Sequence, residues 1–121
     1  MSRPALDPAT VASLLESVGG DEEFLTELFA TFADEAPGLM DTIEAILVGD
    51  DFAGLHRAAH TLKSTSASLG ALQLSEVSRA LEESGRAGSR PSPNQVAEAR
   101  ELLNEALSAM STLTEGTAQH D

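Results

Sequence analysis

Apolar residues recur at three- and four-residue steps along most of the chain, which is the spacing of one face of an α-helix. A β-strand instead needs apolar and polar residues in alternation, and no segment alternates for long enough to form one. The pattern therefore predicts an all-α protein whose helices are separated by residues that commonly begin or end helices.

The first two predicted helices have clear starting residues. Asp7 is a residue type that caps helix N-termini, and Pro8 suits the first helical position, so a short helix is expected here that ends at Gly19–Gly20. Asp21 is expected to cap a long second helix, whose apolar positions continue to Gly49. The chain therefore begins with a short helix followed by a long one.

The long second helix contains a proline and two phenylalanines. Pro37 lacks a backbone N–H group and crowds the preceding turn, so it predicts a kink or a break near Ala36. Phe24 and Phe29 are large apolar residues, and we expect both to be buried in the core rather than exposed for docking.

Three further helices complete the predicted fold. Their expected bounds are Asp50 or Asp51 to Leu69, roughly 72–86 with apolar Leu74, Val77 and Leu81, and a last helix that begins at a capping box, Ser92–Gln95. Residues 115–121 are expected to form a flexible polar tail. Short connections favour antiparallel neighbours, so the predicted architecture is an up-and-down four-helix bundle with the short N-terminal helix packed against one end. The chain is expected to form one domain over residues 1–121, with its core within residues 7–114.

Composition narrows the classes of partner. The 121 residues carry a formal net charge of −13, with 20 Asp and Glu against seven Lys and Arg, which disfavours binding to nucleic acid or to an anionic membrane surface. The chain has no cysteine, so it has no disulfide and no thiolate metal site. It also shows no apolar run of the ~20 residues needed to span a membrane, and its N-terminus, MSRPALDPAT, lacks the apolar stretch of a signal peptide, so none is expected. A cytoplasmic location is expected.

The helix that contains His60 presents this histidine on its outer face. Successive residues on a helix turn by about 100°, which places one stripe toward the core, namely Phe52, Leu55, Ala59, Leu62, Ser66 and Leu69. His60 lies far from the centre of that stripe and is therefore expected to point toward solvent. Its neighbours on the same face are the small residues Ala53, Ser64 and Ala67, with Arg57 to one side and Lys63 to the other.

An exposed imidazole among small side chains suits phosphoryl transfer. A neutral imidazole nitrogen is a competent nucleophile toward an activated phosphoryl group. The ammonium of Lys63 is expected to reach the imidazole and to stabilise the charge on the phosphoryl oxygens. The small residues leave room for a second protein, and the sequence has no ATP-binding loop, so the donor is expected to be a protein and no cofactor is expected.

The segment HTLKSTSASLG, from His60 to Gly70, resembles the motif of histidine phosphotransfer (HPt) domains, in which a lysine follows the histidine by three positions. The resemblance extends over most of the chain. It implies a four-helix bundle that accepts a phosphoryl group from a receiver-domain aspartate and passes it to another receiver, without intrinsic kinase activity. It also implies a phosphorylated His60, a phosphate-stabilising Lys63, and partners that are response-regulator receiver domains and a hybrid histidine kinase.

One position departs from the family pattern, because Ser64 stands where many HPt domains have glycine after the lysine. Serine is small, and its hydroxyl is expected to reach the phosphate. The docking face for partners is expected to contain Ala53, Arg57, Ala67 and Gly70, and the protein is expected to act as a monomer.

Two other functions are compatible with a helical chain that carries a histidine. The phosphoacceptor and dimerisation region of a histidine kinase usually has an acidic residue after the histidine and a proline a few positions on, whereas this chain has Thr61 and then no proline before Pro91. In a purely structural helical adaptor His60 would have no chemical role. Acid-labile, base-stable phosphate would distinguish transfer from scaffolding.

Two smaller alternatives concern residues of the same helix. His56 and His60 have the i, i+4 spacing of paired metal ligands, but no third ligand is evident, and His120 lies in the tail, so no metal site is expected. Arg57 is expected either to contribute to docking or to pair loosely with Asp50 or Asp51.

Overall fold

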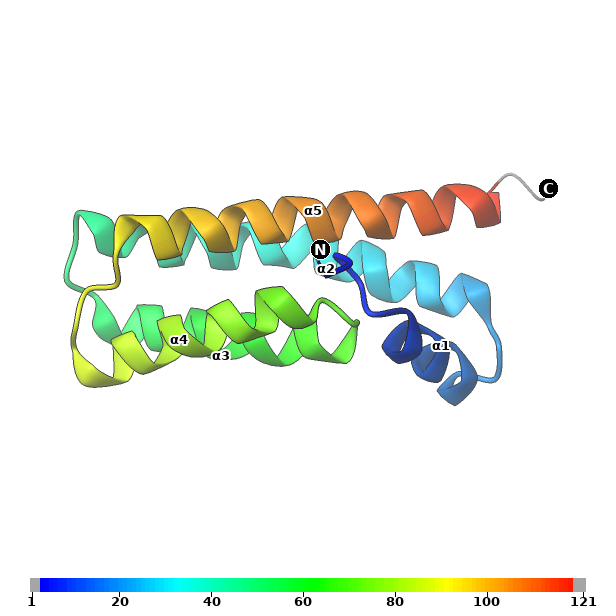
Figure 1. Ribbon diagram of the computed structural model, residues 1–121, viewed down its shortest axis with the longest axis horizontal. Coiled ribbons are helices and arrows are strands. Elements are labelled where there is room, and N and C mark those ends of the chain that lie inside the picture. The colour runs from blue at the N-terminus through cyan, green and yellow to red at the C-terminus, as the bar shows by residue number, and fades with distance from the viewer. Residues whose placement is uncertain (1–2, 119–121) are drawn as a thin grey trace.

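The computed structural model describes residues 3–118, which form a bundle of α-helices with no strand in that range. The elements are α1 (Pro8–Ser17), α2 (Glu22–Glu44), a short 3-10 turn η1 (Ala45–Leu47), α3 (Phe52–Ser68), α4 (Leu72–Ala87) and α5 (Pro93–Ala118). Figure 1 shows α2, α3, α4 and α5 side by side along the long axis, with α1 at one end. The predicted four-helix bundle with an extra N-terminal helix is confirmed.

Aspartate side chains begin three of the helices. The carboxylate of Asp7 accepts the N–H of Thr10 at 3.0 Å, which satisfies a backbone donor that has no partner within the helix. Asp21 does the same for α2, at 3.1 Å from the backbone nitrogen of Phe24. Asp51, rather than Asp50, caps α3. These caps explain why the predicted starts of the first three helices agree with the structure.

Two predicted features of the helices differ from the structure. Of the kink or break predicted near Ala36, the break is absent, because the buried residues on either side of Pro37, Phe32 and Met40, keep α2 packed on the core. The residue whose carbonyl loses its donor, Ala33, is exposed, so water can satisfy it. α5 continues to Ala118, so residues 115–118 are helical rather than part of a tail. The rest of the predicted tail, residues 119–121, lies outside the described range.

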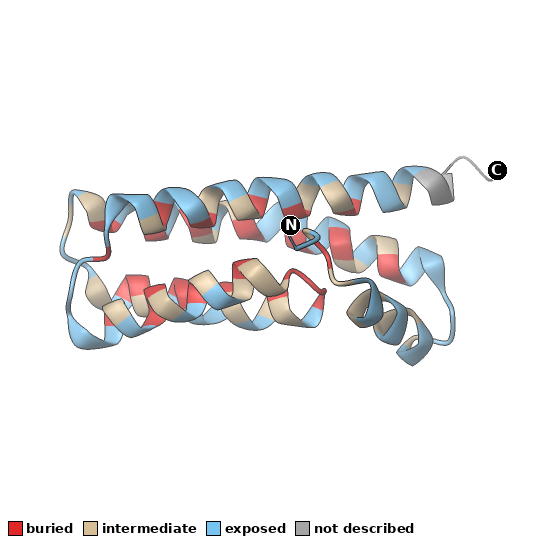
Figure 2. Ribbon diagram, in the orientation of Figure 1, coloured by how far each residue is buried: buried red, intermediate tan, exposed pale blue. Residues whose placement is uncertain are grey.

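The core lies between the inward faces of the four long helices (Figure 2). It is built from aliphatic residues, Phe29 and Phe32, and two methionines. The prediction that Phe29 is buried is confirmed, but Phe24 is 45% exposed, so its predicted burial is wrong. Phe24 precedes the buried Leu25, and a step of one residue turns a side chain by about 100°, away from the core. None of the helices described between residues 3 and 118 has both the length and the apolar character to cross a membrane.

Candidate functional site

α3 presents the two faces that its sequence predicts. The stripe toward the core contains Leu55, Ala59, Leu62 and Ser66, each no more than 1% exposed. On the other side, the side chain of His60 is 58% exposed. The prediction that His60 points toward solvent is therefore confirmed.

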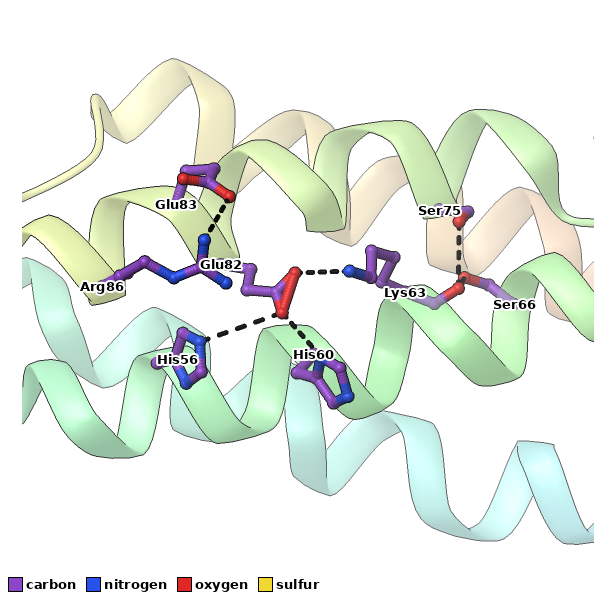
Figure 3. Close-up of polar contacts among 8 residues, drawn as sticks. All are labelled: His56, His60, Lys63, Ser66, Ser75, Glu82, Glu83 and Arg86. Carbon is purple, nitrogen blue, oxygen red and sulfur yellow. Dashed lines mark hydrogen bonds and ion pairs between the residues drawn. The ribbon is translucent and has the colours of Figure 1, made fainter.

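A buried carboxylate from the neighbouring helix holds the inner edge of His60. Glu82 of α4 is 2% exposed, and its Oε2 lies 2.6 Å from Nδ1 of His60. Its other oxygen, Oε1, accepts a hydrogen bond from Nζ of Lys63, also at 2.6 Å. Figure 3 shows these contacts, with the second ring nitrogen of His60 directed away from Glu82. One buried carboxylate thus binds both His60 and Lys63, the two residues of the HTLK segment that the sequence predicts to act in phosphoryl transfer.

The state of Glu82 determines which nitrogen of His60 is free. The hydrogen bond from Lys63, together with that from His60, lowers the pKa of Glu82 to about 2 although burial opposes the shift. Glu82 is therefore a carboxylate at neutral pH and can only accept hydrogen bonds. Neutral His60 must then carry its proton on Nδ1, which leaves the lone pair on the outward-facing Nε2.

Small residues let α4 approach α3 closely enough for Glu82 to reach His60. A Cβ atom on Gly85 would lie 2.6 Å from the backbone nitrogen of His56, so only glycine fits at this position. Further along the interface, the hydroxyl of Ser75 donates to the backbone oxygen of Lys63 at 2.9 Å, and Ser78 is fully buried. The small side chains of α4 at this interface therefore allow the two backbones to approach closely.

Sequence reasoning missed Glu82, the residue that organises the site. The apolar spacing identified Leu74, Val77 and Leu81 of α4, but it gave no information on the polar residues of the same buried face. A signal was available, because Glu82 stands four residues after Ser78 and three before Gly85, in line with two small residues on one side of the helix. An acidic residue within such a row is positioned to enter a tight helix–helix interface.

Lys63 does not lie where the sequence placed it. Its ammonium was expected to reach the imidazole directly, but it binds Oε1 of Glu82 instead, and Lys63 and His60 are linked only through the carboxylate. The reason is that a buried carboxylate is a stronger partner for an ammonium group than a neutral imidazole. The side chain of Lys63 is 30% exposed, so its charge still faces the surface beside His60.

The expected docking residues have different surroundings in the structure. Ala53 and Arg57 are exposed, and Ala67 is half-buried. Ser64, the expected phosphate contact, is also exposed. Arg57 forms no salt bridge with any residue of the range 3–118, so the predicted loose pair with Asp50 or Asp51 is absent there.

Gly70 is buried, which removes it from the exposed face where the sequence placed it. A Cβ at this position would lie 3.3 Å from Val11 and 3.4 Å from the backbone oxygen of Asp7, because the N-terminal segment packs over the turn. Its φ of +91° lies in a region that favours glycine. Gly70 therefore ends α3 and is not available to a partner.

A shallow apolar groove lies beside the histidine face, between α2 and α3. Its volume is about 300 Å³, and the residues along it include Leu28, Phe32 and Leu39 of α2 and Ser64 and Thr65 of α3. Ser64, four residues after His60, thus joins the groove to the exposed imidazole. The face around His60 is continuous with an apolar surface.

His56 faces the same carboxylate as His60. The two rings are stacked, with centroids 6.3 Å apart and an angle of 20° between their planes. Nε2 of His56 lies 3.9 Å from Oε2 of Glu82, which is beyond hydrogen-bonding distance. No group of three or more His, Cys, Asp or Glu residues in the described part of the chain is arranged to hold a metal ion.

Comparisons with known proteins agree on one family. The family model of the Hpt domain matches residues 27–112. The chain is also similar to a solved structure, the histidine-containing phosphotransfer protein B (HptB) from Pseudomonas aeruginosa PAO1, with a TM-score of 0.81 and 27% sequence identity. The match covers 92% of this chain and 95% of that one. No curated protein matches the chain.

Proposed function

Because this chain belongs to the Hpt domain family, and so is a histidine phosphotransfer protein of a phosphorelay, we propose that His60 is the residue that carries the phosphoryl group. The observation that carries this proposal is the contact between Nδ1 of His60 and the buried Glu82, at 2.6 Å. It leaves Nε2 as the nucleophile on an exposed ring.

The transfer step follows from this arrangement. Nε2 of His60 attacks the phosphorus of a phosphorylated aspartate in a receiver domain, an N–P bond forms, and the bond from phosphorus to the aspartate oxygen breaks. The aspartate leaves as a carboxylate. The imidazole keeps its proton on Nδ1 and becomes a cation, which the charge of Glu82 stabilises at the moment it develops. Transfer to the next receiver is the reverse of this step.

Lys63 and Ser64 complete the proposed phosphate site. The ammonium of Lys63 shares Glu82 with the imidazole, so it lies beside His60 and can balance the negative charge of the phosphoryl oxygens. Ser64 is exposed one turn after His60, where its hydroxyl can donate to the same oxygens. Both residues act on the phosphoryl group rather than on the nucleophile.

Hpt domains interact with response-regulator receiver domains and with kinases. For this chain we infer that a receiver docks over Ala53, Arg57, Ala67 and the apolar groove between α2 and α3. We further infer that the protein works as a cytoplasmic monomer, has no kinase activity of its own and, with a net charge of −13, does not bind nucleic acid.

Replacement of the histidine tests the acceptor directly. His60→Gln should fold with the helical circular dichroism of the wild type and should gain no acid-labile, base-stable phosphate from a phosphorylated receiver. The wild type is the positive control with the same receiver. Full labelling of His60→Gln would exclude His60 as the acceptor and would leave the adaptor or another histidine as the explanation.

Bulk on the docking face tests the partner. Ser64→Tyr places a large side chain between His60 and the groove on an exposed position, so stability should change by no more than about 0.5 kcal/mol. Transfer from a receiver should fall by orders of magnitude, whereas small-molecule phosphoramidate, which needs no docking, should still label His60. Lys63→Ala should slow receiver transfer less. Equal loss of both reactions in Ser64→Tyr would contradict docking at this face.

A further inference from the structure

The charges of the protein are unevenly divided among its helices. α2 carries seven acidic residues and no basic one, and α5 carries four acidic residues against Arg100 alone. α3 has no acidic residue within its bounds, and α3 and α4 together carry four Lys and Arg against three Glu. Most of the formal net charge of −13 therefore lies on α2 and α5, while the two helices that carry His60 and Glu82 are close to neutral.

The salt bridges increase this difference. Each of the three glutamates of α4 is paired with a basic side chain, in the pairs Glu76–Arg3, Glu82–Lys63 and Glu83–Arg86. Arg57 of α3 and Arg79 of α4 are exposed and form no salt bridge within residues 3–115. On α2, Asp41 and Glu44 share Arg100, and the other five acidic residues form no salt bridge within the same range. The surface of α3 and α4 thus has unpaired positive charge, and that of α2 has unpaired negative charge.

The unpaired arginine of α3 borders His60 on the side away from α4. Arg57 stands three residues before His60, which places it about 60° around the helix from the imidazole. Lys63 stands three residues after His60 and therefore lies about 60° to the other side, where it binds Glu82 of α4. Arg57 consequently lies on the edge of the histidine face that adjoins α2.

The unpaired arginine of α4 borders the same face from the opposite side. Arg79 stands three residues before Glu82, about 60° around α4. The buried Ser78 and Gly85 lie on the other side of Glu82, so Arg79 is on its solvent side. Because Glu82 contacts His60, the exposed imidazole has one unpaired cation on each side.

The negative charge begins at the far side of the apolar groove. Glu35 of α2 lines this groove opposite Ser64 and Thr65 of α3, and it forms no salt bridge within residues 3–115. A partner that covers both the groove and the imidazole therefore meets negative charge over α2 and positive charge on either side of His60. An acidic partner surface fits over α3 and α4 and is repelled by α2.

We propose that Arg57 and Arg79 are specificity-determining residues that select receiver domains with an acidic surface beside the phosphorylated aspartate. This inference rests on the proposed function of His60, and it extends the docking surface onto α4. Complementary charges attract a partner before contact and can raise association rates by about 10- to 1,000-fold. The acidic α2 and α5 repel the same partner surface, so productive encounters are directed to the face that carries His60.

The test is the salt dependence of phosphoryl transfer. The probe is the phosphorylated receiver domain that labels the wild type fastest, and the second-order rate constant of transfer is measured. At an ionic strength of about 0.01 M, Arg57→Gln combined with Arg79→Gln should lower this constant at least about threefold, and the corresponding pair of Arg→Glu changes at least about tenfold. At about 1 M, where charges are screened within ~3 Å, these differences should disappear.

Two further double variants separate local charge from other effects. Arg57→Lys combined with Arg79→Lys keeps both charges and should restore the rate to within about twofold of the wild type. Asn104→Glu combined with Ser111→Glu is the matched control, because it changes the net charge by as much as the Arg→Gln pair but at exposed positions of α5. α3 and α5 each pack on α2 and α4, so α5 lies diagonally across the bundle from α3. The control should slow transfer less than about twofold.

A charge exchange in the receiver identifies the partner surface. Lysines in place of the acidic residues beside its aspartate should slow transfer to the wild type and should restore transfer to the Arg→Glu pair. No effect of these lysines would overturn the inference, as would an Arg→Glu loss that is equal at low and high salt or is matched by the α5 control. A loss of phosphoramidate labelling as large as the loss of receiver transfer would assign the arginines to the phosphoryl group instead.

Two measurements complete the test. Sedimentation of the wild type at low salt should show no self-association, and association that the Arg→Glu pair abolishes would make a second copy of this chain the occupant and overturn the inference. Absence of phosphate on His60 with every receiver would overturn the proposed function. Salt-dependent binding of the unphosphorylated receiver, weakened by the Arg→Glu pair and not by the α5 control, would then still support the acidic partner surface.

Discussion

The interface between α3 and α4 and the inward faces of α2 and α5 bury different kinds of side chain. α2 and α5 bury large apolar residues, among them Phe29, Phe32, Met40, Ile43, Leu103 and Met110. The three buried polar residues in the range 3–115, Ser66, Ser78 and Glu82, all belong to α3 and α4. Apolar burial stabilises the fold in proportion to its area, whereas polar burial costs free energy unless partners compensate it. Both halves of the bundle therefore stabilise the fold by apolar burial, and α3 and α4 in addition bury the polar groups that position the site.

Two carboxylates show the same division. Glu44 of α2 pairs with Arg100 of α5 at 2.6 Å, but both side chains are about a third exposed, so water screens the pair. Glu82 makes contacts of the same length with Lys63 and His60 while almost fully buried. The surface pair of Glu44 and Arg100 contributes little to stability. The buried Glu82 fixes the tautomer of His60.

The largest expected effect is the loss of a core side chain away from the site. Leu103→Ala removes a fully buried side chain of α5 and should lower the free energy of unfolding by about 2–5 kcal/mol through the cavity it leaves. Urea unfolding measures this loss. Phosphate acceptance per folded molecule should remain that of the wild type, and a loss of acceptance in the folded variant would show that the two halves are not separable.

Widening the α3–α4 interface should lower stability by a smaller amount and should also reduce phosphate acceptance by His60. Gly85→Ala places a methyl group 2.6 Å from the backbone nitrogen of His56, so α4 must move outward, at a cost of about 1–3 kcal/mol. The carboxylate of Glu82 moves with the helix, and phosphate acceptance by His60 should fall as well.

Gly38→Ala is the matched control for Gly85→Ala, because Gly38 is an exposed helical glycine with open space around its Cβ position. It should stabilise the protein by about 0.5–1 kcal/mol and leave acceptance unchanged. Unchanged acceptance in Gly85→Ala, measured beside this control, would mean that the close approach of α4 serves packing alone.

Glu82→Gln should cost about 1–2 kcal/mol at neutral pH, and the cost should depend on pH. The pKa of Glu82 is about 2 in the folded protein, below its ordinary value of 4.5, so its stabilising charge is fully present above about pH 4.5 and is lost as the pH falls toward 2. The difference in unfolding free energy between wild type and Glu82→Gln should therefore shrink over that interval. A difference that stays constant from pH 7 to pH 3 would contradict an ionised Glu82.

The smallest expected effect is at the exposed edge of the site. Ser64→Ala should leave stability within about 0.5 kcal/mol of the wild type. If its hydroxyl donates to the phosphoryl group, transfer should slow by about two- to tenfold, the range of one hydrogen bond. Ser108→Ala, at an exposed serine of α5, is the control and should have no effect. Equal rates for both variants would remove Ser64 from the phosphate site.

The sequence predicted the fold better than the site. The spacing of apolar residues shows which side chains of a helix are buried, but not which residues of other helices they contact. The spacing of Leu55, Ala59 and Leu62 was enough to place His60 on the exposed face of α3. The same information placed Lys63 beside His60 but not on Glu82, because that contact crosses between helices and depends on their separation. Gly85 sets the separation of the two helices, and this role is recognised only when the position of the neighbouring backbone, at His56, is known.

The missing break at Pro37 and the exposure of Phe24 have a common physical origin. Local preference suggests a kink or a break at the proline and burial of the phenylalanine. Tertiary packing decides otherwise, because residues on both sides of Pro37 are held in the core, and Phe24 lies on the outer side of the first turn of α2. Helix starts were predicted well, since an aspartate cap acts within its own turn.

The contacts around Glu82 also have a consequence for how the chain folds. His56, His60, Lys63 and Glu82 lie within residues 56–82, on two helices joined by a turn of three residues. Contacts between near neighbours in sequence close short loops, which costs little chain entropy and favours rapid folding. The hairpin of α3 and α4 is therefore expected to form before α5 packs. During synthesis, the contacts of Glu82 with His60 and Lys63 can form while the last helix is still being made.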